Sequence, residues 1–178
     1  MPTEMLGAAQ LHLALNHLPV IGVLIATIVL IVGAGARSTQ LKSFGLALLV
    51  CAAVTAVPAY LTGEPAEEAI EDRPGISKSL IERHEEAAET ALAATLVAGA
   101  IAAAAWLSLR SGRLRIAHGA FALALVASLG ATGLLAWTAH LGGQIRHDEI
   151  RPGSIQGAYE SGAGSRGGER SGGGPLGP

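Results

Sequence analysis

Histidine is the residue type in this sequence whose number and spacing could support chemistry. His140 and His147 stand seven residues apart and flank the Gly142-Gly143 pair, where the last long apolar stretch ends. On a continuous helix, positions i and i+7 share one face and lie roughly 10 Å apart along the axis. One metal ion cannot take both ligands across that gap, so the spacing predicts two stacked sites, or one site and a gate. The other four histidines are His12, His17, His84 and His118.

The elements that must position these histidines are long apolar stretches. Half of the 178 residues are hydrophobic, only 15% are charged, and the mean hydropathy is +0.45, which predicts a membrane protein. A helix needs about 20 apolar residues to cross a hydrocarbon core of about 30 Å. Four stretches are long enough, and we expect transmembrane helices over about 11–35, 41–61, 77–109 and 113–141. Their many Ala and Gly residues allow close backbone approach, so the expected fold is all-α, a tight four-helix transmembrane bundle.

Polar sequence flanks and interrupts these spans. Residues 1–10 are expected to form an N-terminal segment outside the bundle, which occupies residues 11–151. In the strongly acidic loop between the second and third spans, residues 64–72 predict a short surface helix that stops before Pro74-Gly75. Residues 152–178 are rich in Gly and Ser and cannot bury a core, so we expect a flexible, disordered tail.

The charges of the short loops predict how the bundle is oriented. The first and third loops contain basic residues and no acid, which places them in the cytoplasm by the positive-inside rule. Both termini and the acidic second loop then lie in a periplasm or its equivalent. Trp137 and Tyr60 fall near the outer edge of the spans and Trp106 near the inner edge, as interfacial anchors should. The basic loop residues are Arg37, Lys42, Arg110, Arg113 and Arg115.

With this topology, five histidines lie on the outer side of the membrane. His17 and His140 fall close to the outer hydrocarbon boundary, and three more lie one or two turns above it, namely His12, His84 and His147. Imidazoles from facing helices are the usual means by which a bundle holds haem iron or another transition metal. The acids beside His84 could orient a ligating histidine, build a zinc or copper site with it, or form a solvated face. His118 lies near the inner end of the fourth span and is expected to snorkel or hydrogen-bond rather than to bind a ligand.

Several other chemistries are excluded. The sequence has no C-x-x-C-H, so haem cannot be attached through thioethers. It has no nucleophile elbow, phosphate loop or H-E-x-x-H, because position 88, where the second histidine after His84-Glu85 would stand, is alanine. Without a basic patch it is not expected to bind nucleic acid.

The histidine motifs resemble those of a family of small four-helix bacterial membrane proteins of uncharacterised function. The resemblance covers residues 11–151 and rests on His12-x4-His17-x-Pro19, on Thr62-Gly63 and on His84. His140-x-Gly142-Gly143-x3-His147 is similar to an element of relatives that occur with, or fused to, c-type cytochromes, although Asp148-Glu149 stands where those relatives tend to have Gly. The resemblance implies a redox role with one or two non-covalent haem b groups.

Two classes of function follow. The first is a haem b-binding electron-transfer subunit in a bacterial inner membrane, with both termini periplasmic, and at most one subunit of an oxidoreductase complex. Its partners would be membrane lipid, other membrane subunits and either a quinol or a c-type cytochrome. The second class is a non-redox accessory subunit of a larger membrane complex, whose histidines only form hydrogen bonds.

For the first class we predict how the ligands pair. The first and fourth helices run antiparallel, so His17 and His140 are expected at the same level, at the hydrocarbon boundary. We predict that they pair there, where a haem has apolar walls. Further out, His12 would pair with His147, and His84 could replace either outer ligand. The glycine pair would leave space for a flat ring between the two levels. The candidate cofactor-binding residues are His12, His17, His84, His140, His147, Gly142 and Gly143; the candidate iron ligands are His12, His17, His140 and His147.

Overall fold

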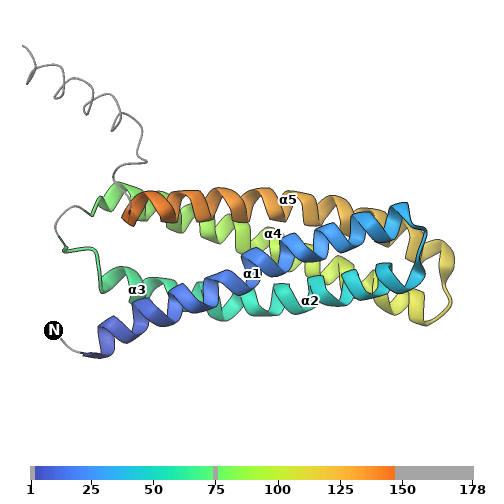
Figure 1. Cartoon of the computed structure of the whole chain (residues 1–178), viewed down its shortest axis with the longest axis horizontal. Helices are drawn as coiled ribbons and strands as arrows, with labels where there is room; N and C mark the ends of the chain where they lie inside the picture. Colours follow the sequence, from blue (N-terminus) through green and yellow to red (C-terminus); the bar gives the residue numbers. More distant parts are fainter. Residues whose placement is uncertain (1–2, 74–75, 147–178) are drawn as a thin grey trace, which may run out of the picture.

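A computed structural model of the chain describes residues 3–73 and 76–146. Four long helices lie alongside one another, α1 (Thr3–Gly35), α2 (Thr39–Leu61), α4 (Lys78–Arg110) and α5 (Leu114–Arg146), and a short α3 (Gly63–Glu68) follows α2 (Figure 1). α1 packs on α2, α2 on α4 and α4 on α5, and α5 returns to α1, so the helices close an up-and-down bundle. Each long helix is long and apolar enough to cross a membrane. The predicted all-α four-helix fold is confirmed, and the chain is a multi-pass membrane protein.

The helix boundaries differ from the predicted ones at three places. α1 begins at Thr3, so residues 3–10 belong to the first helix and are not a separate segment. α3 ends at Glu68 rather than at residue 72. α5 continues through the glycine pair at 142–143 to Arg146, because an unbroken helix satisfies every backbone group in an apolar setting even where propensity is low. His147 and the predicted tail over 152–178 lie outside the described residues.

Small side chains line the interfaces between the helices. A Cβ added to Gly22 would lie 3.0 Å from the Cβ of Ala52, and one added to Gly99 would collide with the Cβ of Ala53. Such close approach is the means by which helices associate in lipid, where burying leucine gives no hydrophobic gain. Many of the large apolar side chains accordingly face outwards, where lipid can cover them. They include Leu13, Leu18, Ile28, Val32, Phe44, Val54, Leu61, Val97, Leu107, Leu123 and Val126.

The two ends of the bundle differ in charge. We call one the α3 end: it holds α3, the starts of α1 and α4, and the ends of α2 and α5 (Figure 1). The acidic residues of the 64–89 region lie there. The opposite end, the basic end, holds the α1–α2 and α4–α5 connections, whose charged residues are all Arg or Lys.

Candidate functional site

His12 joins α1 to the last turn of α2. Its half-buried ring places Nδ1 3.0 Å from the carbonyl oxygen of Ala59 and 3.2 Å from Oγ1 of Thr62. α2 ends at Leu61, and the carbonyls of a last helical turn lose their partners within the helix, so the Ala59 oxygen is available. A carbonyl can only accept a hydrogen bond, so Nδ1 must carry the proton that it donates. Nε2 of a neutral His12 is then the atom with a free lone pair.

His84 makes the equivalent connection between α4 and α5. Its half-buried ring lies with Nδ1 3.0 Å from the carbonyl oxygen of Thr138, so Nδ1–H again donates to backbone. One turn further along α5, Gly142 meets the edge of the same ring: an added Cβ would lie 3.0 Å from Cε1 of His84. The predicted space at Gly142 for a flat ring is therefore occupied by the imidazole of His84, whose close approach to α5 requires a residue without a side chain.

These two histidines come from opposite sides of the bundle but lie near one another. Helices α1 and α4 are diagonal partners in the four-helix ring, but both rings lie at the α3 end, His12 bonded to the last turn of α2 and His84 bonded to α5 near its end. Within the described part of the chain, Nε2 of neither ring has a hydrogen-bond partner. We call this pair, with the carbonyls of Ala59 and Thr138 that hold it, the His12–His84 site.

His17 and His140 lie differently from this pair. Both are exposed on the sides of their helices. Nδ1 of His17 donates to the carbonyl of Leu13 in its own helix, at 2.6 Å. Nε2 of His140 accepts a hydrogen bond of 2.8 Å from the side-chain amide of Gln144, and the His140 ring lies 5.7 Å from that of Trp137. No hydrogen bond among the described residues joins His17 to His140, and their pairing stays a prediction.

The remaining candidates are placed as follows. Gly143 lies in the same turn of α5 as Gly142. His118 is exposed near the start of α5, at the basic end and far from the other histidines. The proposed pairing of His12 with His147 cannot be followed past Arg146, because His147 is outside the described residues.

Carboxylates surround the site at the α3 end. Glu67, half-buried on α3, loses hydration on burial and lies near the carboxylates Glu85, Glu64 and Glu71; these effects, in that order, raise its pKa to about 7. Glu85 directly follows His84 in α4, so this acidic cluster adjoins the His12–His84 site. A carboxyl group with such a pKa exchanges protons with water near neutral pH.

The donor set decides which cofactor fits. In the described part of the chain, no group of three or more His, Cys, Asp or Glu side chains is arranged to hold a metal ion, so the zinc or copper alternative built on His84 and its acids finds no such cluster there. Haem iron takes only one or two axial ligands from the protein, and paired imidazoles are common among them. Two neutral histidines with oriented rings and free Nε2 atoms fit that requirement.

Sequence reasoning missed the partners that hold the two rings. The carbonyl of Ala59 had a detectable signal, because the predicted end of the second span near residue 61 leaves the last carbonyls of that helix unpaired. The carbonyl of Thr138 had no such signal, because it lies inside α5 rather than at a helix end. Nδ1–H of His84 bonds to the second lone pair of that carbonyl oxygen. No protein-family model, curated protein or solved structure matches this chain. The family resemblance of the histidine motifs stays a prediction.

Proposed function

We propose that this membrane protein is an electron-transfer subunit that would hold haem b non-covalently at the α3 end, where His12 and His84 would bind it. The observation that carries the proposal is the matched state of the two rings. Each donates Nδ1–H to a carbonyl of a neighbouring helix, and among the described residues Nε2 of neither ring has a hydrogen-bond partner. A bond of this kind fixes the tautomer and orientation of a ligating histidine and raises its basicity. When bound, haem would supply the one-electron chemistry.

This assignment revises the predicted ligand pair. His140 is less suited, because the amide of Gln144 already donates to its Nε2. In the described part of the chain, Nε2 of His17 has no hydrogen-bond partner, so His17 is the candidate for a second haem, either on the lipid-facing surface or against another subunit. His147 is retained as a possible partner for that second site.

The expected setting follows from the charges. The basic end would face the cytoplasm of a bacterial inner membrane, and the α3 end with both termini would face the periplasm. The carboxylates of the α3 end suit a basic c-type cytochrome as electron partner, and a quinol in the membrane is the alternative. A protease-sensitive tag on the C-terminus should be cleaved in intact spheroplasts; protection of that tag would reverse the orientation.

Absorption spectroscopy tests the proposal. The full chain, purified from cells supplied with haem precursors, should show a sharp alpha band on reduction with dithionite. His12→Ala and His84→Ala should each abolish the same band, whereas His118→Ala, at the basic end, should leave it intact. A protein without the band, or a band that survives both alanine substitutions, would contradict the proposed ligand pair.

A second candidate function is a non-redox accessory subunit, and one observation favours it. The bonds from His12 and His84 tie α1 to α2 and α4 to α5 whether or not a ligand is present. Each such bond stabilises the fold by about 0.5–1.5 kcal/mol. On this alternative the histidines serve only as ties between helices, and the two roles differ in which ring nitrogen they require.

A further inference from the structure

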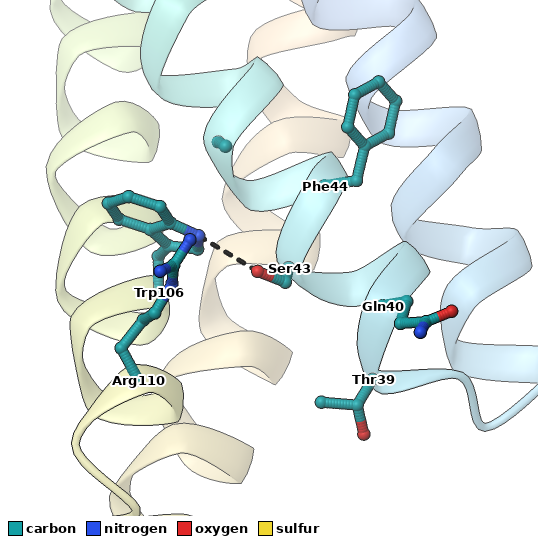
Figure 2. Close-up of a pocket in the computed structure, with 7 residues that line it drawn as sticks. Thr39, Gln40, Ser43, Phe44, Trp106 and Arg110 are labelled. Carbon is teal, nitrogen blue, oxygen red and sulfur yellow. Dashed lines mark hydrogen bonds between the residues drawn. The ribbon is translucent and has the colours of Figure 1, made fainter.

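An open groove of about 500 Å³ lies between α2 and α4 at the basic end, opposite the His12–His84 site. Figure 2 shows Trp106 and Arg110 on α4 facing Ser43 on α2, with Gln40 and Thr39 nearer the start of α2. Phe44 and Ala47 complete the lining. The groove therefore carries polar groups near the helix ends and apolar groups deeper along the helices.

The polar part of the groove contains an unneutralised cation held in place. The guanidinium carbon of Arg110 lies 4.8 Å from the centre of the Trp106 ring. The indole Nε1–H of Trp106 in turn donates to Oγ of Ser43, at 3.0 Å, which fixes the ring across the two helices (Figure 2). In the part of the chain that the structure describes, the ion pairs involve only Lys78, Glu71 and Asp72, so Arg110 has no carboxylate partner there.

The apolar part of the groove continues onto the lipid-facing surface. Phe44 is 59% exposed and Leu107, next to Trp106, is 60% exposed, values that a side chain reaches only when nothing in the bundle covers it. A Trp at this level is typical of the interface between headgroups and acyl chains. An occupant that satisfies both parts needs an anionic head and an apolar tail.

We infer that this groove binds an anionic phospholipid. Its phosphate would meet the guanidinium of Arg110, within reach of the side chains of Thr39 and Gln40, and an acyl chain would lie against Phe44, Ala47 and Trp106. The charge of the whole end is complementary, because its loops carry Arg and Lys and no acid. Arginine presents several N–H donors in a planar fork that matches phosphate oxygens, which adds specificity to the attraction of charge alone.

This inference is independent of the proposed haem site. Gln40 and Thr62 stand at opposite ends of α2, about 22 residues apart, which corresponds to about 33 Å of helix. A lipid at the basic end therefore cannot contact the His12–His84 site, and either assignment can fail without the other.

The two tryptophans of the chain provide the test, because Trp106 lies in the groove and Trp137 lies at the α3 end. The full-length Trp137→Phe protein retains Trp106 as its reporter, and the Trp106→Phe protein retains Trp137. Each is reconstituted in phosphatidylcholine, and quenching is measured as brominated phosphatidylglycerol or brominated phosphatidylcholine with the same acyl chains is added. We expect Trp106 to prefer phosphatidylglycerol by at least about tenfold, as a charge-assisted hydrogen bond implies, and Trp137 to show no preference.

Substitutions in the Trp137→Phe background separate a built site from general attraction. Arg110→Gln should reduce the preference at Trp106 to less than about twofold, whereas Arg115→Gln, an exposed cation at the same end outside the groove, should leave it nearly unchanged. Circular dichroism checks that both variants keep their helices. A preference that survives Arg110→Gln, that falls equally with Arg115→Gln, or that also occurs at Trp137 would overturn the inference. Competition by inorganic phosphate at the same concentration as the lipid would show an anion site without lipid recognition, which also overturns it.

Discussion

The α3 end and the basic end of the bundle use polar side chains in different ways. At the α3 end, half-buried histidines donate to backbone carbonyls of neighbouring helices, and carboxylates lie close together. At the basic end, two cations lie over aromatic rings, the exposed Arg110 over Trp106 and the half-buried Lys42 over Phe121 at 5.0 Å. A polar group fixed inside a membrane bundle requires a reason to be there, whereas an exposed cation at a helix end is solvated by water and headgroups. The comparison therefore supports the proposals of a cofactor site at the α3 end and of lipid recognition at the basic end.

Backbone packing differs between the ends as well. At the basic end, a Cβ added to Gly33 would lie 2.9 Å from the backbone nitrogen of Lys42. At the α3 end, the neighbour of Gly142 is the ring of His84. Backbone cannot move aside without shifting a helix, but a side chain can rotate. The basic end should thus be the more rigid end. At the α3 end, a substitution should disturb the His12–His84 site more than it lowers the stability of the fold.

The largest expected effect tests the rigid end. Gly33→Ala should lower the free energy of unfolding by about 2–3 kcal/mol, because the new methyl meets the α2 backbone. Unfolding in mixed micelles of mild detergent and dodecyl sulfate measures it. Gly35→Ala, two residues along the same helix with open space around it, is the matched control and should change stability by less than about 0.5 kcal/mol. Equal losses for both variants would remove the argument that α1 and α2 are fixed by close backbone contact.

A smaller loss is expected at the α3 end. Gly142→Ala should cost about 1 kcal/mol, because the His84 ring can give way by a few tenths of an ångström. The same variant should nevertheless lose most of its reducible haem, since the ring moves from its bond to Thr138. Gly133→Ala, in the same helix with nothing within 4 Å, should keep both stability and haem. If Gly142→Ala retained full haem content, the position of the His84 ring would not matter to the cofactor.

The acidic cluster gives a pH dependence. The pKa of Glu67 is raised to about 7 in the folded protein, so between its ordinary value and 7 the folded state binds more protons than the unfolded state. Stability should therefore fall as pH rises through that range and level off above it. Glu67→Gln should remove this loss and be more stable than the native protein at pH 8, by on the order of 1 kcal/mol after allowance for solvent screening, with little difference at pH 4. Identical profiles for the two proteins would mean that Glu67 is not desolvated.

The smallest effect concerns the ion pairs of the α3 end. Lys78 lies 3.5 Å from Glu71 and 3.7 Å from Asp72; the Lys78 and Asp72 side chains are largely exposed and that of Glu71 is half-buried. Lys78→Ala should change the free energy of unfolding by less than about 0.5 kcal/mol, because water screens such pairs. A loss above 1 kcal/mol would show that the loop between α3 and α4 contributes more to the fold than these contacts suggest.

Apolar length and small-residue content were enough to predict the four-helix bundle, because a lipid-embedded chain must satisfy its backbone within helices. The order of the spans was enough to predict that His12, His17, His84 and His140 lie toward the same end of the bundle. It did not predict that His12 and His84 face inward while His17 and His140 are exposed. That choice depends on the rotation and tilt of α1 and α5, which are set by contacts such as those of Gly142 and Gly22 with neighbouring helices rather than by hydropathy. The continuation of α5 to Arg146 was not predicted, because the fourth span was ended at residue 141, where the apolar stretch gives way to polar sequence, and a helix can extend beyond the length that the hydrocarbon core requires.

The central claim is that Nδ1 of His12 and His84 holds the ring in place while Nε2 would bind iron. Substitution of either histidine by asparagine tests the roles of the two ring nitrogens separately. The Asn side chain can place an amide N–H near the position of Nδ1 and has nothing at the position of Nε2. The decisive measurement is haem content, from the reduced-minus-oxidised spectrum, together with the free energy of unfolding of the haem-free protein, for His84→Asn and His84→Ala. We predict that His84→Asn recovers most of the stability lost in His84→Ala and yet loses the same haem band as His84→Ala does, and that the His12 pair behaves alike. If His84→Asn retained the haem band, or if no variant and no native protein carried one, the histidines would be ties between helices and the haem assignment would be wrong.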